Sequence, residues 1–193
     1  MIARIEGKII EKNPAYTIID CNGVGYKVNV SLHTYSQLPD SGTCVLHTQQ
    51  IIREDAHLLY GFFQKSEKEM FNLLISVSGV GASSANLILS AMDPGEIQEA
   101  IVNGDVGSLK GVKGIGNKTA ERIIVDLRDK LSKEEITSIS PGLGNSLKDE
   151  ALSALLMLGY NKALAEKSLS KVMKDNNDQV SVELLVKAVL KGN

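Results

Sequence analysis

The stretch 111-GVKGIGNKTAERIIVDL-127 decides how this chain folds, because it repeats the pattern of an earlier stretch, 78-SGVGASSANLIL-89. In both stretches one aliphatic residue stands between two glycines, small or polar residues follow, and a helical apolar pattern comes next. The first glycines of the two triplets, Gly79 and Gly114, are 35 residues apart. The sequence therefore predicts the same sharp turn twice, each time at the start of a helix.

The two glycine turns are suited to binding an anion. The start of a helix leaves backbone N–H groups without partners and carries a partial positive charge. Glycine adopts positive φ and allows close approach to its backbone, while the aliphatic residue anchors the turn in the core. We therefore expect the turns to hold two phosphates of a nucleic-acid backbone without reading its bases. The predicted contact residues are Gly79, Val80, Gly81 and Ser83 at the first turn, and Gly114, Ile115, Gly116, Lys118, Thr119 and Arg122 at the second.

The glycine turns have three other possible interpretations. The plain alternative is that the glycines only end helices and allow close packing, but the repetition and the cations after the second turn argue against it. Residues 111–119 approximate the nucleotide-binding pattern GxxxxGK[ST], yet Asn117 displaces the lysine by one position. The dinucleotide fingerprint GxGxxG also fails, because Ser84 and Thr119 occupy the place of its third glycine.

Composition places the chain among folded proteins, with its basic charge concentrated in one region. It has 193 residues, 43% of them hydrophobic, and no apolar run approaches the length of a transmembrane helix. Cys21 and Cys44 lack metal-type spacing, so we expect them to be core residues of a cytoplasmic protein. The net charge is −2, yet residues 106–131 carry six basic side chains against three acidic ones. This local excess surrounds the second glycine turn.

Residues 1–63 have the pattern of an all-β domain. Short segments rich in β-branched and aromatic residues alternate with turn signals such as Asn13-Pro14 and Asn22-Gly23. The predicted strands are RIEGKII, YTIIDC, VGYKVNV, TCVLHTQQII and HLLYGFF, with a helical turn at 33–38. Five short strands suit a small closed barrel, which leaves few exposed edges.

Residues 64–131 are predicted to be helical. Ser66 and Glu69 have the spacing of a capping box, Asp93 before a proline is a second cap, and Asn117 is predicted to cap the last helix. The apolar stripe of that helix is Ala120, Ile123, Ile124, Leu127 and Leu131.

The last third of the chain is predicted to form a linker and a small bundle. Residues 132–146 are polar, contain proline and glycine, and predict a flexible linker. Residues 147–193 then have three helical patterns, at 149–158, 162–173 and 181–190, the last with Ser181 as its cap.

An acidic turn separates the last two predicted strands. Arg53, Glu54 and Asp55 stand at this bend, for which a solvated hairpin tip is the plain explanation. The functional hypothesis is electrostatic: an acidic projection that faces DNA repels phosphates and keeps paired strands apart. Glu54, Asp55 and His57 supply too few ligands for a cation site. Because no known catalytic motif occurs, we expect no catalytic residue, no metal and no cofactor.

Several segments are specific enough to indicate a family. They are MIARIEGKIIEK, NGVGYKV, REDAHLLYGF, SGVG, GIGNKTAERIIVDLRDKL and ALLMLGY. With them the chain resembles, nearly end to end, the RuvA family of bacterial Holliday-junction-binding subunits. The resemblance implies an α+β fold: an OB-fold barrel with an acidic pin at 1–63, two helix–hairpin–helix motifs at 64–131, and a UBA-like three-helix domain after the linker. It implies a homotetramer on Holliday junction DNA in recombination and repair, and leaves open an octamer on DNA.

The resemblance also implies roles for individual residues. The family's DNA-binding hairpins map onto the two glycine turns, and its acidic pin maps onto Glu54 and Asp55. The C-terminal domain is similar to one that docks the ATPase RuvB, with Leu155, Leu158 and Tyr160 as contact candidates that could equally be core. RuvB would hydrolyse ATP and RuvC would resolve the junction, so the chain itself would be a non-catalytic subunit of the helicase complex.

This chain departs from the family pattern at two places, and two other functions are alternatives. Ala82-Ser83 stands where a Pro-Lys pair is common, and Asn117 where a basic residue is frequent. A helix–hairpin–helix glycosylase or nuclease would need a catalytic carboxylate such as Asp126, whose spacing from Arg122 favours a surface ion pair. A single-strand-binding barrel would expose aromatic side chains. Three such residues are instead predicted to pack inward: Tyr16, Tyr26 and Tyr60.

Overall fold

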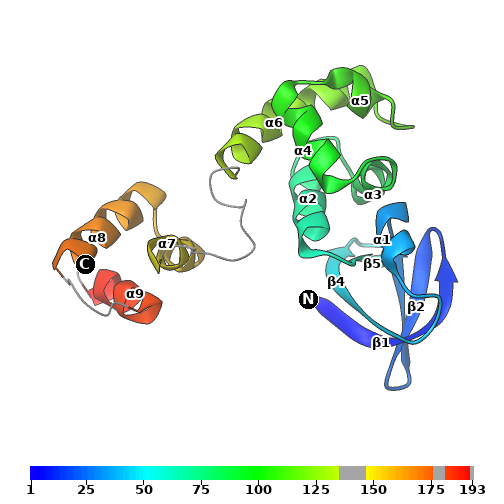
Figure 1. Ribbon diagram of the computed structural model, residues 1–193, viewed down its shortest axis with the longest axis horizontal. Helices are drawn as coiled ribbons and strands as arrows, with labels where there is room; N and C mark the ends of the chain where they lie inside the picture. Colours follow the sequence, from blue (N-terminus) through cyan, green and yellow to red (C-terminus); the bar gives the residue numbers. More distant parts are fainter. Residues whose placement is uncertain (135–146, 176–180, 192–193) are drawn as a thin grey trace. The chain divides into compact units, whose positions relative to one another are not determined.

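The computed structural model describes residues 1–134, 147–175 and 181–191 (Figure 1). The chain divides into two compact units, Met1–Glu134 and Glu135–Asn193. The predicted barrel and the predicted helix–hairpin–helix motifs both fall within the first unit, so the boundary we placed between residues 63 and 64 stays a prediction. From residue 135 onward, the predicted linker lies outside the described residues.

Five strands close into a barrel within residues 1–62, all of which the structure describes. They are β1 (Arg4–Asn13), β2 (Tyr16–Cys21), β3 (Val24–Val30), β4 (Thr43–Ile52) and β5 (His57–Phe62), with helix α1 (Leu32–Gln37) between β3 and β4. The order around the barrel is β1-β2-β3-β5-β4. Only the β3–β5 pair is parallel. The predicted strands, barrel and helical turn are therefore confirmed.

Alternation of side chains explains how the barrel is filled. In β4, Cys44, Leu46 and Thr48 are buried while their neighbours are more exposed, as expected for a strand with one face toward a core. Burial raises the pKa of the Cys44 thiol, and both cysteines are free, which agrees with a packing role. The β2–β3 hairpin turns at Asn22 and Gly23, whose φ values are 54° and 90°.

Tyr60 lies in the core, but the prediction that Tyr16 packs inward is wrong. The Tyr16 hydroxyl donates a hydrogen bond to Glu11 Oε1 at 2.5 Å, and Lys27 Nζ lies 4.2 Å from the centroid of its ring. That hydrogen bond raises the pKa of Tyr16. The ring is held at the outer face of the barrel because neighbouring charged side chains give it partners there.

The rest of the first unit is helical. Its helices are α2 (Lys65–Ile75), α3 (Ala82–Ala91), α4 (Pro94–Asn103), α5 (Val106–Lys110) and α6 (Asn117–Glu134). The predicted cap at Asp93 is confirmed, since its Oδ1 accepts from the N–H of Glu96 at 2.9 Å within a capping box. The capping box predicted at Ser66 is wrong. The N-cap residue of α2 is Gln64, and no side chain makes a capping hydrogen bond there.

The core of the helical block includes two residues of β5, Tyr60 and Phe62, whereas the interior of the barrel forms a separate apolar cluster. The ring of Phe71 on α2 lies 5.0 Å from that of Tyr60 and 4.9 Å from that of Phe62, both on β5. The predicted stripe on α6 is buried in the core of the helical block, and its members are Ala120, Ile123, Ile124, Leu127 and Leu131. The packing of α2 on β5 therefore ties the two parts of the unit together.

The second unit is a bundle of α7 (Leu147–Met157), α8 (Lys162–Asp175) and α9 (Val182–Lys191). Its core contains Ala151, Leu155, Ala165, Leu169, Leu185 and Val189. The predicted cap at Ser181 is confirmed by a 3.3 Å hydrogen bond from the N–H of Leu184 to Ser181 Oγ. Among the helices of the described residues, none is long and apolar enough to cross a bilayer.

Candidate nucleic-acid interface

The two glycine turns have the same hydrogen-bonded geometry. In the first, the N–H of Val80 donates to the carbonyl of Val77 at 3.0 Å; in the second, the N–H of Ile115 donates to the carbonyl of Val112, also at 3.0 Å. Gly79 and Gly114 each sit inside such a turn, with φ of 92° and 90°. A side chain at either position would be strained, so the backbone itself requires these two glycines.

Each turn is anchored by a buried aliphatic residue. Val80 and Ile115 are both 5% exposed, and their N–H groups are used inside the turns. These two residues therefore hold the turn in the core and donate nothing to a ligand through their N–H groups. The surrounding core positions repeat with the same 35-residue period: Leu74 and Leu109, Val77 and Val112, Ala85 and Ala120, Ile88 and Ile123 are all buried.

The helix starts after both turns present free N–H groups. The first backbone bond of α3 runs from Ala85 to the carbonyl of Gly81 at 2.9 Å, and that of α6 runs from Ala120 to the carbonyl of Gly116 at 3.0 Å. The N–H groups of 82–84 and of 117–119 have no partner among the described residues. Three donors and the helix dipole thus point out of each turn, which is the arrangement that binds phosphate.

The second glycine of each triplet leaves the approach to these donors open. Gly81 has φ of −85°, and neither Gly81 nor Gly116 is among the positive-φ residues. A Cβ atom built on either one would meet nothing within 4 Å. Neither the backbone nor the packing of the described chain requires glycine there, and the absence of a side chain leaves the helix start open to close approach.

Charges beside the two turns differ. Lys118 and Arg122 are exposed near the second turn, with Arg122 Nε 3.8 Å from Asp126 Oδ2. The predicted cap at Asn117 is wrong: it is the first residue of α6, and its side-chain amide donates to Glu121 Oε1 at 2.5 Å. The free N–H groups of this helix are therefore left uncapped. At the first turn, exposed Ser83 offers a hydroxyl, and residues 78–91 include no cation.

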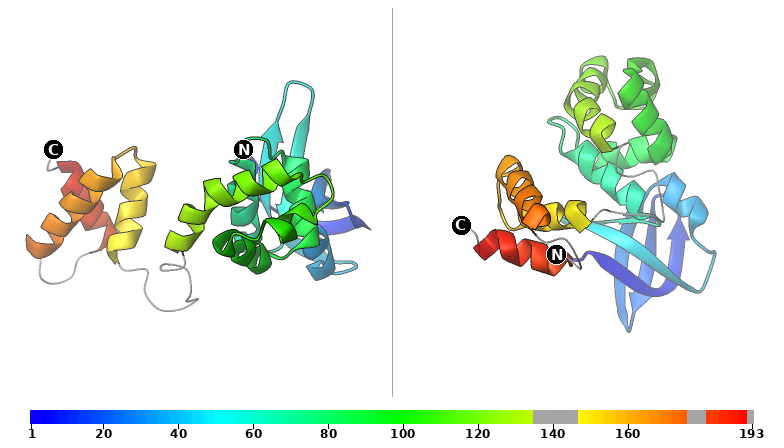
Figure 2. Two further views of the ribbon diagram at one scale, coloured as in Figure 1. Left: turned by 90° about the horizontal axis from the view of Figure 1, so that it is seen from above. Right: turned by 60° about the vertical axis from the view of Figure 1, so that its left-hand side comes forward.

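The acidic turn lies at the tip of the β4–β5 hairpin, which projects from the body of the first unit (Figure 2, left). The tip is closed by a 2.8 Å hydrogen bond from the N–H of Arg53 to the carbonyl of Ala56. Glu54 and Asp55 are exposed, and no hydrogen bond or ion pair to either occurs in the described part of the chain. Their charges are therefore available to act on a ligand.

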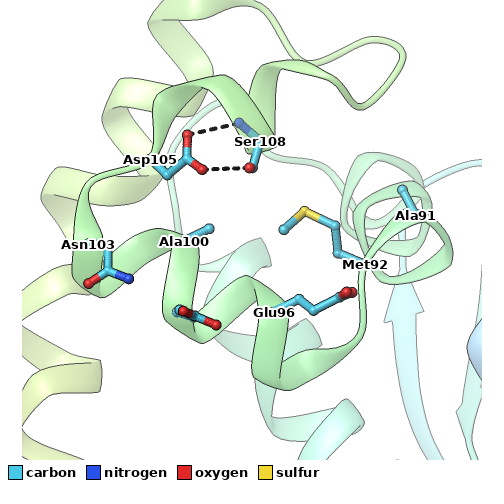
Figure 3. A pocket seen from close by; sticks show the side chains of 8 residues that line it. Ala91, Met92, Glu96, Ala100, Asn103, Asp105 and Ser108 are labelled. Carbon is cyan, nitrogen blue, oxygen red and sulfur yellow. Dashed lines mark hydrogen bonds between the residues drawn. The ribbon is translucent and has the colours of Figure 1, made fainter.

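A pocket of about 440 Å³ lies against α4 and α5 and is acidic (Figure 3). Glu96, Glu99 and Asp105 line it, and Ser108 donates to Asp105 through its hydroxyl at 2.6 Å and its N–H at 3.1 Å. The hydroxyl bond is the main reason that the pKa of Asp105 is lowered. The pocket therefore disfavours phosphate. Across the described residues, no group of three or more His, Cys, Asp or Glu side chains is placed to hold a metal ion.

The three residues predicted to contact a motor differ in exposure. Leu155 is fully buried in the core of the second unit, and Tyr160 is partly buried against it. Leu158 is 61% exposed and precedes Gly159, whose φ of 89° ends α7. Leu158 is the most accessible of the three, whereas Leu155 serves the fold.

A barrel followed by a repeated turn that frees backbone donors defines the class: an OB-fold protein with a helix–hairpin–helix tandem. Family models match three parts of the chain: "RuvA N terminal domain" at residues 1–61, "SAM-like Helix-hairpin-helix tandem" at 71–129 and "RuvA, C-terminal domain" at 146–192. Similar proteins include the Holliday junction branch migration complex subunits RuvA of Flavobacterium psychrophilum and Christiangramia forsetii, at 51% and 48% identity. The RuvA of Bacteroides fragilis is 44% identical, and each comparison covers 99% of both chains. The chain belongs to the RuvA family.

Proposed function

We propose that this chain binds four-way DNA junctions independently of base sequence, as the non-catalytic DNA-binding subunit of a branch-migration complex. The observation that carries the proposal is the pair of matching helix starts, each with three free backbone N–H groups and an open glycine in front of them. Backbone donors bind phosphate without reading bases, and they do so even in a protein whose net charge is −2.

The proposed DNA-binding site contacts phosphates through both neutral and charged groups. N–H groups after Gly81 and Gly116 bind phosphates, with the hydroxyl of Ser83 beside the first turn and Lys118, Thr119 and Arg122 beside the second. The acidic tip lies at the crossover, where Glu54 and Asp55 repel phosphates and keep the strands apart. Because Arg122 lies beside Asp126, we assign that carboxylate to an ion pair and propose no glycosylase or nuclease activity.

The proposed assembly is a cytoplasmic homotetramer whose symmetry matches the four arms of the junction. The relatives are named as subunits of a branch migration complex, which supports a partnership with the ATPase RuvB. We propose that RuvB docks on the second unit and supplies ATP hydrolysis, while RuvC resolves the junction.

Competition in a gel-shift assay tests the proposed function. Labelled four-way junction is challenged with unlabelled junction, duplex and single strands of matched length, at two salt concentrations. We expect the junction to compete at least about tenfold better than duplex, for junctions of unrelated sequence alike, and binding to weaken with salt because phosphate contacts release counterions. Equal competition by duplex would contradict the proposal.

Neutralising the acidic tip with Glu54→Gln and Asp55→Asn is expected to keep or tighten junction binding by a few fold, because two charges that repel phosphate are removed. Branch migration with RuvB is expected to slow. The matched control removes two charges from the acidic pocket, with Glu96→Gln and Glu99→Gln, and should change neither measurement. A large loss of junction affinity in the tip variant would argue against the repulsive role.

Leu158→Glu is expected to weaken RuvB binding by about tenfold or more, because it puts a charge on an apolar contact surface. Junction binding should not change. Leu184→Glu is the matched control, since Leu184 on α9 is 56% exposed, close to the 61% of Leu158. Calorimetry with purified RuvB measures both, and equal effects of the two substitutions would remove Leu158 from the docking site.

A further inference from the structure

A buried polar cluster joins the barrel to the helical block. Glu67 on α2 is fully buried, and its two carboxylate oxygens accept hydrogen bonds from the hydroxyls of Ser31 and Thr34, which flank the start of α1. The Thr34 hydroxyl also accepts from the N–H of Phe63 at 3.0 Å, and Ser31 Oγ accepts from the N–H of Thr34 at 2.9 Å. Every polar group of the cluster is therefore satisfied by another member.

The cluster sits at the junction between β5 and α2. Only Phe63 and Gln64 connect the two elements, so these residues form the joint between them. Thr34 holds the backbone of the joint at Phe63, and it also holds Glu67 in the first turn of α2. Apolar packing of Phe71 on β5 is non-directional, whereas hydrogen bonds to fixed hydroxyls set an orientation.

The two elements that meet at this joint lead to the two ends of the proposed DNA site. β5 runs from the acidic tip to the joint, and α2 runs from the joint to the first glycine turn. At the usual rise per residue, β5 and α2 are levers of about 20 Å and 16 Å. A rotation of about 10° at the joint would move either end by about 3 Å, the length of a hydrogen bond.

A second pair of contacts fixes the same orientation. Asn86 Nδ2 on α3 donates to the carbonyl of Val30 at 3.0 Å, and the N–H of Leu32 donates to Ser90 Oγ at 3.1 Å. These bonds hold α3, the helix that follows the first glycine turn, against the start of α1. Helix α1 is thus held by α2 and α3 together.

We infer that Glu67, with Ser31 and Thr34, is a positioning residue that sets the acidic tip against the glycine turns, so that the protein opens a junction as well as binding it. The inference rests on the proposed function. It separates two properties: contacts at the glycine turns supply most of the affinity, and the joint determines whether the tip reaches the crossover.

The test measures affinity and opening on the same junction. Full-length protein is titrated onto a four-way junction carrying 2-aminopurine at the crossover, whose fluorescence rises when its base unstacks. Thr34→Val keeps the side-chain volume but removes the hydroxyl, and Glu67→Gln keeps one acceptor oxygen but removes the charge. For both we expect the fluorescence rise at saturation to fall by at least half, with the dissociation constant changed less than about threefold.

Thr34→Ser is the conservative rescue, because it keeps the hydroxyl and loses only a methyl group. It should open the junction as the unchanged protein does. If opening and affinity fell in parallel in Thr34→Val, or if opening were unchanged in both variants, the inference would be overturned. Failure of the unchanged protein to prefer junctions would instead overturn the proposed function, so the two failures are distinguishable.

Discussion

Gly116→Asp is expected to lower junction affinity by about a hundredfold, roughly 2.7 kcal/mol, while the melting temperature stays the same or rises. Asp at the N-cap position accepts from the free N–H groups of α6 and interacts favourably with the helix dipole. The free energy of unfolding should therefore stay the same or rise. The same carboxylate occupies the place of a phosphate and repels one. Gel shifts with four-way junctions and thermal denaturation measure the two effects.

Gly116 suits this test better than Gly114 does. With φ of 90°, Gly114 cannot be replaced without straining the turn, and a loss of binding would be ambiguous. The matched control is Asn161→Asp, because Asn161 Oδ1 already accepts from the N–H of Ala163 at 3.0 Å at the start of α8 in the second unit. It adds the same charge at a helix start and should leave junction affinity unchanged. Unchanged affinity in Gly116→Asp would remove this turn from the site.

Phe71→Ala is expected to lower the free energy of unfolding of the first unit by about 3–5 kcal/mol, because a fully buried ring would leave a cavity. Its ring contacts Tyr60 and Phe62 on β5, so we expect the substitution to destabilise the barrel and the helices together, in one unfolding transition. Urea denaturation, followed by far-ultraviolet circular dichroism, measures it.

Phe63→Ala is the matched control for Phe71→Ala. The Phe63 side chain is 40% exposed, and its removal should cost less than about 1 kcal/mol. A similar small cost for Phe71→Ala would show that packing of α2 on β5 contributes little to stability. Separate unfolding of strands and helices would show that the two parts of the unit fold independently.

Local patterns were sufficient for the elements of the fold. Strand alternation in β4, the Asn22-Gly23 turn and the 35-residue repeat each depend on residues close together in the chain, where φ preferences and side-chain period act directly. The barrel, the helices and the repeated glycine turn were therefore predicted correctly from these patterns, whereas the helix–hairpin–helix tandem was predicted from the resemblance to the RuvA family. The predicted DNA contacts stay predictions, and so does the boundary between the barrel and the helices, since both lie in one compact unit.

The error at Ser66 arose because long-range partners replaced a local one. Ser66 has the right spacing for a capping box, but the first turn of α2 is fixed by Glu67, which reaches Ser31 and Thr34 more than 30 residues away. A signal was present: Glu67 lies on the apolar face of α2, three and four residues before Met70 and Phe71. An acidic residue on a buried face requires partners, and the sequence did not identify them.

The sequence alone determined the strands, the helices and the two glycine turns, because these follow from backbone preferences and side-chain periods over a few residues. The tertiary structure decided which N–H groups stay free, which of Leu155 and Leu158 is exposed, and how Glu67 joins the barrel to the helices. Those features depend on which groups meet in space, and burial and hydrogen-bond partners are set by the packing of the whole unit.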